Sequence, residues 1–138
     1  MQVYKIDNMD RKIISTAAIL GMIAIILGAF GAHAIKKVLL IDQLATFETG
    51  VRYQMYHALF LLLIGILPEI TQKTKKLIYY LTLSGVVLFS GSIYLLATND
   101  LTPFDFKTIG FVTPIGGLLL ILAWGALLLH YFNKKSQN

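Results

Sequence analysis

The sequence predicts an all-α polytopic membrane protein in which four transmembrane helices form a bundle. Four long apolar stretches carry this prediction: residues 13–35, 50–67, 77–98 and 108–132. A helix needs about 20 mostly apolar residues to cross a bilayer, and each stretch is close to or above that length. The composition agrees, since 57% of the 138 residues are hydrophobic and 14% are charged, against about 25% charged in soluble domains. The connections are short, so residues 1–138 are predicted to form a single transmembrane domain.

The cysteine content and the distribution of charge narrow the classes of function. The chain has no cysteine, which removes disulfides, thiolate metal sites, iron–sulfur clusters and cysteine nucleophiles. The net charge of +5 does not indicate nucleic-acid binding, because the basic residues occur in pairs and triplets at the ends of the apolar stretches. At those positions they attract anionic lipid headgroups. We therefore expect membrane lipids, and no nucleic acid, among the partners.

The first apolar stretch, residues 13–35, carries small residues along one side. They recur at steps of three and four: Ala17, Gly21, Ala24, Gly28 and Ala32. Membrane helices associate through small residues that let their backbones approach, so this side is predicted to face another helix.

The segment from residue 36 to 49 is not a plain loop. Leu40, Leu44 and Phe47 recur at helical spacing, with Asp42 on the opposite side. This pattern predicts either an amphipathic helix lying at the membrane interface or a long N-terminal extension of the second span. The sequence leaves both alternatives open.

The second stretch, residues 50–67, is the least apolar of the four. To reach spanning length it must take Arg52 and Gln54 into or near the bilayer, and His57 interrupts its apolar part. An arginine near the end of a span can extend its side chain towards the interface, which reduces the cost of placing the charge in lipid. Pro68 ends the stretch.

The third and fourth stretches look like ordinary spans with one irregularity. Tyrosines stand near both ends of residues 77–98, as in the aromatic belts of membrane proteins, and residues 99–107 form a short polar connection. Residues 108–132 contain Pro114. A proline inside a membrane helix removes one backbone hydrogen bond and often produces a kink, so a bend is predicted here.

Glycines on three of the spans are predicted to be helix-packing positions. They are Gly21, Gly28, Gly31, Gly91, Gly116 and Gly117. Four helices hardly need so many close-packing faces. We therefore expect one face to contact a second copy of the chain or another membrane subunit.

The basic residues flanking the spans predict the orientation. One side holds eight: Lys5, Arg11, Lys12, Lys73, Lys75, Lys76, Lys134 and Lys135. The other side holds four: Lys36, Lys37, Arg52 and Lys107. Cytoplasmic flanks carry the excess of lysine and arginine, so both termini of this multi-pass protein are predicted to be cytoplasmic.

With this orientation, five polar residues fall in or next to the outer leaflet and form the candidate site. They are His33, Glu48, Arg52, Gln54 and His57. Ionisable residues within spans are costly and often mark function. Glu48 and Arg52 are four residues apart and can pair along one helix face, whereas Tyr53 and His57 share another. The residues could line a ligand pocket or make structural polar contacts between helices, and both interpretations stay open.

Nothing in the sequence indicates catalysis. His33 and His57 could ligate haem or a metal if they faced each other, but no carboxylates support them, so we predict no cofactor and no metal site. The sequence has no nucleophile elbow, no HExxH motif and no phosphate loop. We therefore predict that the protein is not an enzyme and has no catalytic residues.

Four sequence blocks resemble the signature blocks of a known family. The blocks are Gly28–His33, Thr49–His57, Leu88–Tyr94 and Thr113–Gly117. They are similar to those of the small four-span bacterial inner-membrane family catalogued as domain of unknown function 423, which is related to a small mitochondrial transmembrane protein. The resemblance implies a four-span membrane protein without an agreed biochemical activity, and it provides no catalytic residue.

Two functions follow from these observations. The first is a structural or accessory role, as a homo-oligomer or as a subunit of a larger membrane complex. The alternative is a small transporter, or a lipid- or anion-binding protein, with a polar pocket in the outer leaflet. In that case Arg52 would favour an anionic group such as a lipid headgroup.

Overall fold

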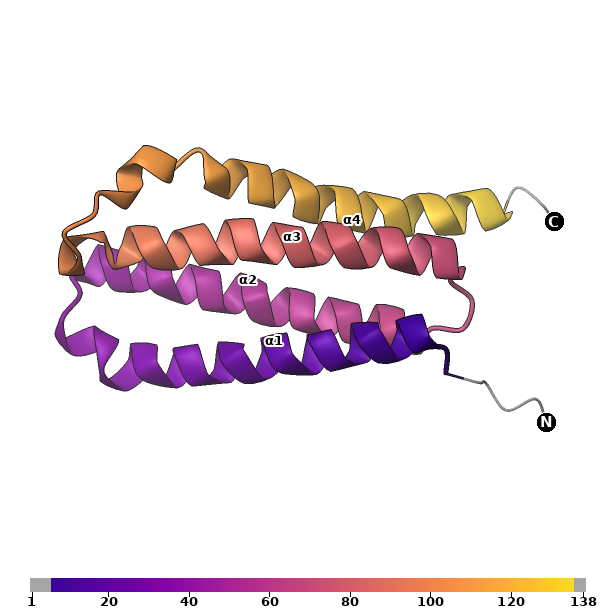
Figure 1. Ribbon diagram of the computed structural model, residues 1–138, viewed down its shortest axis with the longest axis horizontal. Coiled ribbons are helices and arrows are strands. Elements are labelled where there is room, and N and C mark those ends of the chain that lie inside the picture. The colour runs from indigo at the N-terminus through magenta and orange to yellow at the C-terminus, as the bar shows by residue number, and fades with distance from the viewer. Residues whose placement is uncertain (1–5, 136–138) are drawn as a thin grey trace.

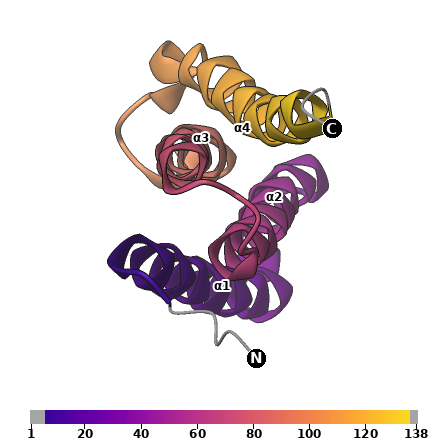
Figure 2. The ribbon, with the colours of Figure 1, turned by 90° about the vertical axis from the view of Figure 1, so that its right-hand side faces the viewer.

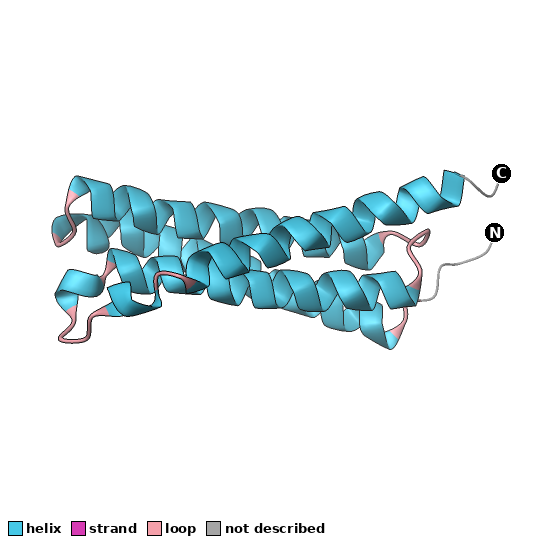
Figure 3. Ribbon diagram, turned by 90° about the horizontal axis from the view of Figure 1, so that it is seen from above, coloured by secondary structure: helices cyan, strands magenta, loops and turns pink. Residues whose placement is uncertain are grey.

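The computed structural model describes residues 6–135 and consists of four long helices joined by short connections (Figure 1). The helices are α1 (Asn8–His33), α2 (Ile41–Ile66), α3 (Gln72–Ala97) and α4 (Val112–Lys135). Three short 3-10 helices lie in the connections: η1 (Ile35–Lys37), η2 (Asn99–Leu101) and η3 (Phe106–Ile109). Viewed from above, the described chain contains helices and loops and no strand (Figure 3). The all-α prediction is confirmed.

Local sequence signals define where the helices begin and end. The Asp7 side chain caps the N-terminus of α1, and Asp10 accepts a hydrogen bond from the Asp7 backbone nitrogen in return, which is a capping box. Thr71 caps α3 through the backbone nitrogen of Thr74. Helix α2 ends at Ile66, and the next residue, Leu67, has an extended conformation, because the following Pro68 disfavours helical geometry in the residue before it.

The helices run alternately in opposite directions, and both ends of the described chain lie at the same end of the molecule (Figure 1). The most extensive contacts join α1 to α2, α2 to α3 and α3 to α4. The end view shows α1 and α4 on opposite sides of the molecule (Figure 2). Helix α4 therefore rests mainly on α3, and much of its surface faces outward.

Three helical segments of the described chain are long and apolar enough to cross a membrane. They are Asn8–Lys37, Gln72–Ala97 and Phe106–Asn133. Helix α2 falls short by composition, because Arg52, Gln54 and His57 interrupt its apolar part. Its 26 residues match α1 and α3 in length. Since α1 and α3 run in the same direction (Figure 1), α2 has to return the chain across the membrane between them.

Two features of the helices differ from a simple span pattern. Residues 41–49 form the first turns of a continuous α2, so the structure has the extended second helix and no separate interfacial helix. Helix α4 begins at Val112 rather than residue 108, which places Pro114 in its first turn. A proline there removes no helical hydrogen bond, so the predicted mid-helix bend at this residue does not occur.

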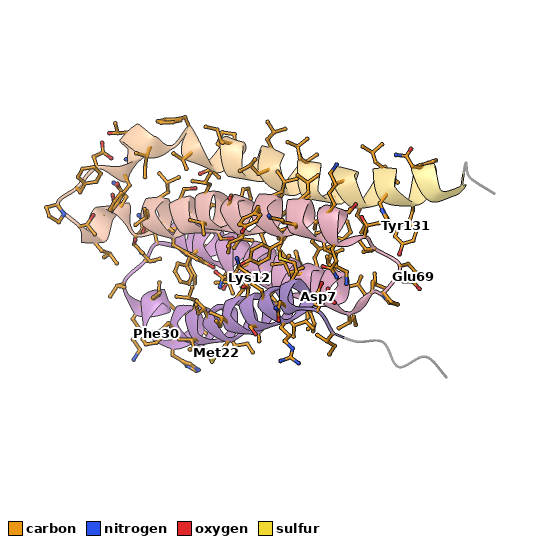
Figure 4. The ribbon with its side chains drawn as sticks, turned by 45° about the vertical axis from the view of Figure 1, so that its right-hand side comes forward. Asp7, Lys12, Met22, Phe30, Glu69 and Tyr131 are labelled. Atoms are coloured by element: carbon orange, nitrogen blue, oxygen red, sulfur yellow. The ribbon has the colours of Figure 1, made fainter. Side chains whose placement is uncertain are left out.

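The main core cluster is apolar, and most of the outward surface of the helices is apolar too. Ile13, Leu61, Ile64 and Ile78 are fully buried at the centre of the main core cluster. Large side chains such as Met22 and Phe30 point away from α1 into the surroundings (Figure 4). An apolar exterior of this extent suits contact with lipid or with other membrane helices.

Candidate functional site

The candidate site lies in the middle of α2, where polar side chains meet three neighbouring helices. Gln54 is close to the midpoint of the helix and His57 lies one turn further along. Both side chains are buried. Because α2 begins at Ile41 rather than Gly50, both lie deeper along their helix than the outer-leaflet position expected from the shorter predicted span.

Gln54 links three helices through its side-chain amide. Its nitrogen donates to the backbone oxygen of Leu20 in α1, at 2.9 Å. Its oxygen accepts from the Tyr94 hydroxyl of α3, at 2.8 Å. The Leu20 carbonyl already belongs to the helical backbone, so the amide uses its second lone pair. This one side chain therefore holds α1 and α3 against α2.

His57 is held in one tautomer by its two contacts. Its Nδ1 lies 2.7 Å from the backbone oxygen of Tyr53. A carbonyl oxygen can only accept, so Nδ1 carries the proton and Nε2 is left as an acceptor. The indole nitrogen of Trp124 in α4 donates to that Nε2 at 3.3 Å. Both ring nitrogens are thus occupied within the chain, and the imidazole joins α2 to α4.

Hydroxyl groups of α3 make further hydrogen bonds to α2 and α4. Ser90 of α3 donates to the backbone oxygen of Gly50 in α2, at 2.8 Å. Ser92 of α3 and Thr113 of α4 share a hydrogen bond of 2.6 Å. Among the described residues, Thr82 has a buried hydroxyl without a partner. Ser90 and Ser92 therefore join α3 to α2 and to α4 by hydrogen bonds.

The other three candidate residues do not join this cluster. His33, Glu48 and Arg52 are exposed. Arg52 donates to the Thr49 hydroxyl at 3.1 Å, and no ion pair within 4 Å joins it to Glu48. The five candidates therefore line no common pocket: two lie inside the bundle and three on its surface.

His33 and His57 lie at different depths. Gly21 of α1 faces Ala58 of α2, so His57 is level with the middle of α1. His33 is the last residue of α1, twelve residues beyond Gly21, or roughly 18 Å along the helix axis. The two imidazoles therefore do not face each other. The described residues contain no group of three or more histidine, aspartate or glutamate side chains placed to hold a metal ion.

A second polar centre, which the sequence does not predict, lies at the end of the bundle where α1 begins and α4 ends. The Lys75 ammonium of α3 donates to Asp10 Oδ1 of α1 at 2.8 Å, and both side chains have no exposed surface. Lys75 also donates to the backbone oxygen of Gly65 in α2, at 3.3 Å. Gln72 donates to the same Asp10 oxygen at 3.2 Å. This buried ion pair ties together α1, α2 and α3.

The sequence does not indicate that Asp10 and Lys75 form an ion pair. Asp10 is separated from Lys75 by 65 positions, and Lys75 stands among other lysines that look like ordinary flanking charges. His130 contacts the backbone oxygen of Glu69 at 3.1 Å, and Glu69 and Tyr131 lie at this end of the molecule (Figure 4).

The glycines differ in how closely they bring helices together. A Cβ on Gly116 of α4 would overlap the backbone nitrogen of Phe89 in α3, and one on Gly85 of α3 would lie 3.1 Å from the backbone nitrogen of Leu120. The position of Gly116 requires glycine, because the backbone atoms of α3 cannot move aside. At the other predicted positions the space for a Cβ differs. A Cβ on Gly31 would be tight against Phe47, and a Cβ on Gly91 would have no atom within 4 Å. A Cβ would be at ordinary contact distance from its neighbours at three positions: Gly21, Gly28 and Gly117. The closest contacts outside these six positions are at Gly50, Gly65 and Gly85.

The grooves between the helices are mostly apolar. A groove of about 340 Å³ between α2 and α4 is lined by Tyr53, His57, Phe89, Gly117, Leu120, Ile121 and Trp124. A groove of about 450 Å³ follows the small residues of α1, where Ala17 and Gly21 face α2. A smaller groove of about 170 Å³ lies between α1 and α2 beside Glu48 and Arg52. Apolar grooves of this kind suit acyl chains or apolar side chains better than a polar solute.

Comparison with known proteins gives a consistent set of relatives. The family model described as protein of unknown function (DUF423) matches residues 27–117. The UPF0382 membrane protein of Staphylococcus saprophyticus is 40% identical over 83% of this chain and 92% of its own length. The UPF0382 membrane protein of Haemophilus influenzae is 34% identical over 93% of this chain and 99% of its own. The UPF0382 inner membrane protein YgdD of Escherichia coli is 34% identical over 94% and 95%. No solved structure matches the chain significantly.

Proposed function

This chain belongs to the DUF423 family of membrane proteins, and from that premise we propose that it is a structural or accessory component of the bacterial inner membrane, acting as a homo-oligomer or as a subunit of a larger complex. The observation that carries the proposal is the use of its buried polar groups. Gln54 and His57 have their side-chain hydrogen-bonding groups engaged by neighbouring helices or by their own backbone. We therefore propose that these two side chains stabilise the arrangement of the helices.

The outward surface of α4 supports an assembly role. This helix rests mainly on α3, and Leu118, Ile121, Leu128 and Leu129 are each more than half exposed. Lipid tails are as apolar as leucine, so such a face gains no hydrophobic stabilisation by leaving lipid. Association would instead come from close packing, for which α4 offers Gly125, with open space in front of it. We expect a partner helix to pack on this face.

The assembly proposal is tested by disulfide cross-linking in native membranes. The chain has no cysteine, so single-cysteine variants report one position each. We expect oxidation to link identical chains, or a second protein, at exposed α4 positions spaced by three or four residues, such as Leu118→Cys and Ile121→Cys. Ala123→Cys is the matched control in the same helix, because Ala123 is fully buried and should give no product. The proposal would be contradicted if cysteines at every exposed position of α1 and α4 gave only monomer, both after oxidation and with a bifunctional cross-linker.

We propose that both termini face the cytoplasm. Two of the basic residues counted as flanking charges do not flank the bundle, because Lys75 is buried in an ion pair and Arg52 lies at mid-helix. Seven basic residues then flank the end that holds the termini and three flank the other end, so the bias that orients membrane proteins is retained.

Labelling of single cysteines tests this orientation. Glu69 and Asp100 are exposed in connections at opposite ends of the bundle. In intact spheroplasts, a membrane-impermeant maleimide should label Asp100→Cys and leave Glu69→Cys unlabelled until the membrane is permeabilised. The reverse pattern would show that the termini face the periplasm.

A further inference from the structure

Two opposite charges on the outward face of α2 stand beside a groove and are not paired with each other. Glu48 and Arg52 are exposed and lie one helical turn apart. Both line the 170 Å³ groove between α1 and α2. No ion pair within 4 Å joins them, and the Arg52 guanidinium instead donates to the Thr49 hydroxyl at 3.1 Å.

The groove has one wall without side chains and one wall with apolar side chains. Gly28 and Gly31 of α1 form one wall, and Phe47 and Val51 of α2 form the other. A Cβ on Gly31 would lie 3.3 Å from the Phe47 ring, and one on Gly28 would lie 3.5 Å from Val51. The two helices are therefore in close contact at the base of the groove, and the charged side chains stand at its edge.

The direction of the Arg52 side chain places its charge towards the membrane surface. Thr49 precedes Arg52 on α2, so the hydrogen bond between them shows that the guanidinium extends towards the N-terminal end of the helix. Lys36 and Lys37 lie at that end in η1. A charge inside a span costs free energy unless it reaches the interface or meets a partner. The backbone of Arg52 lies near mid-helix, so an anionic group that reaches its guanidinium from the membrane surface would be a favourable partner.

We propose that Glu48 and Arg52 bind the headgroup of a zwitterionic amine phospholipid, such as phosphatidylethanolamine. Its phosphate accepts hydrogen bonds from the Arg52 guanidinium, and its ammonium group donates to the Glu48 carboxylate. The ethanolamine linker separates these groups by a distance that suits side chains one helical turn apart. The first part of an acyl chain then lies along the groove between α1 and α2. The lipid adds to the structural role proposed above and does not depend on it.

The charge pattern favours this headgroup over the alternatives. An anionic headgroup would satisfy Arg52 but would place a second negative charge near Glu48. A choline headgroup carries a quaternary ammonium that has no N–H to donate to a carboxylate. The amine headgroup is the one that pairs with both side chains.

The experiment is native mass spectrometry of the purified full chain in detergent, titrated separately with phosphatidylethanolamine, phosphatidylglycerol and phosphatidylcholine that carry identical acyl chains. We expect the first lipid to bind about tenfold more tightly than the others, as one charge-assisted hydrogen bond implies. Arg52→Gln should weaken its binding by a similar factor. Glu48→Gln should remove the preference for phosphatidylethanolamine over phosphatidylglycerol.

Matched controls and two outcomes decide the proposal. Lys36→Gln and Asp42→Asn remove exposed charges at the same end of the bundle and should bind all three lipids like the unmodified chain. Equal binding of the three lipids, or binding that neither Arg52→Gln nor Glu48→Gln changes, would overturn the proposal and identify the lipid as adventitious. A dimer that carries no lipid and dissociates in both variants would also overturn it, because a second copy would then occupy this surface.

Discussion

Replacing Gly116 with alanine is expected to separate α4 from α3 and to destabilise the bundle. The added Cβ would overlap the backbone nitrogen of Phe89 and would lie 2.8 Å from the backbone carbon of Leu88. These are backbone atoms of a regular helix, so no side-chain rotation relieves the overlap. Moving α4 outward would also weaken the hydrogen bond between Ser92 and Thr113, which measures 2.6 Å.

The expected loss is about 1–3 kcal/mol in the free energy of unfolding, the range for overpacking a close contact. Gly91→Ala in α3 is the matched control, because Gly91 has no atom within 4 Å of the added Cβ. This control should be neutral or stabilising by up to about 1 kcal/mol, since alanine favours the helix more than glycine does. Unfolding in mixed micelles titrated with SDS measures both variants. Equal effects at the two positions would contradict the close contact between α3 and α4.

The helices could be predicted from the sequence because each depends on a local signal. Apolar stretches of spanning length, Asp7 before α1, Thr71 before α3 and Pro68 after α2 act within a few residues of where they stand. The same local information left the start of α2 open, since an amphipathic pattern over residues 36–49 fits a surface helix as well as an extension. What decides the matter is packing: Gly31 of α1 faces Phe47 of α2, which holds that segment against the bundle.

The contacts between helices could be predicted only in part, because they depend on which faces meet. Gln54 and His57 were identified because buried polar residues are rare in spans, but nothing in the sequence indicates their partners Leu20 and Trp124. The sequence places Arg52 at the same membrane level as Gln54 and His57 but on another face of the helix, and in the structure that face is exposed. Small residues likewise predict a packing face without its partner, so Gly91 was included although it faces open space.

The ion pair between Asp10 and Lys75 is the contact whose loss should cost the most. Both side chains have no exposed surface, and their charged atoms are 2.8 Å apart. Removing one member of such a buried pair typically costs about 3–5 kcal/mol, because the other buried charge loses the attraction of this close counter-charge. Replacing both members by neutral groups of similar size is much less costly, since two buried charges are removed together.

The central claim is that buried polar groups in this protein hold helices together, and a double-mutant cycle at this ion pair tests it most directly. The variants are Asp10→Asn, Lys75→Met and the two combined, with Lys76→Met, an exposed neighbour, as the control. We predict that each single variant unfolds at much lower SDS, that the combined variant recovers most of the loss, and that it assembles in membranes like the unmodified chain. A combined variant that is stably folded but no longer assembles would contradict the claim, because the two charges would then serve something other than the fold.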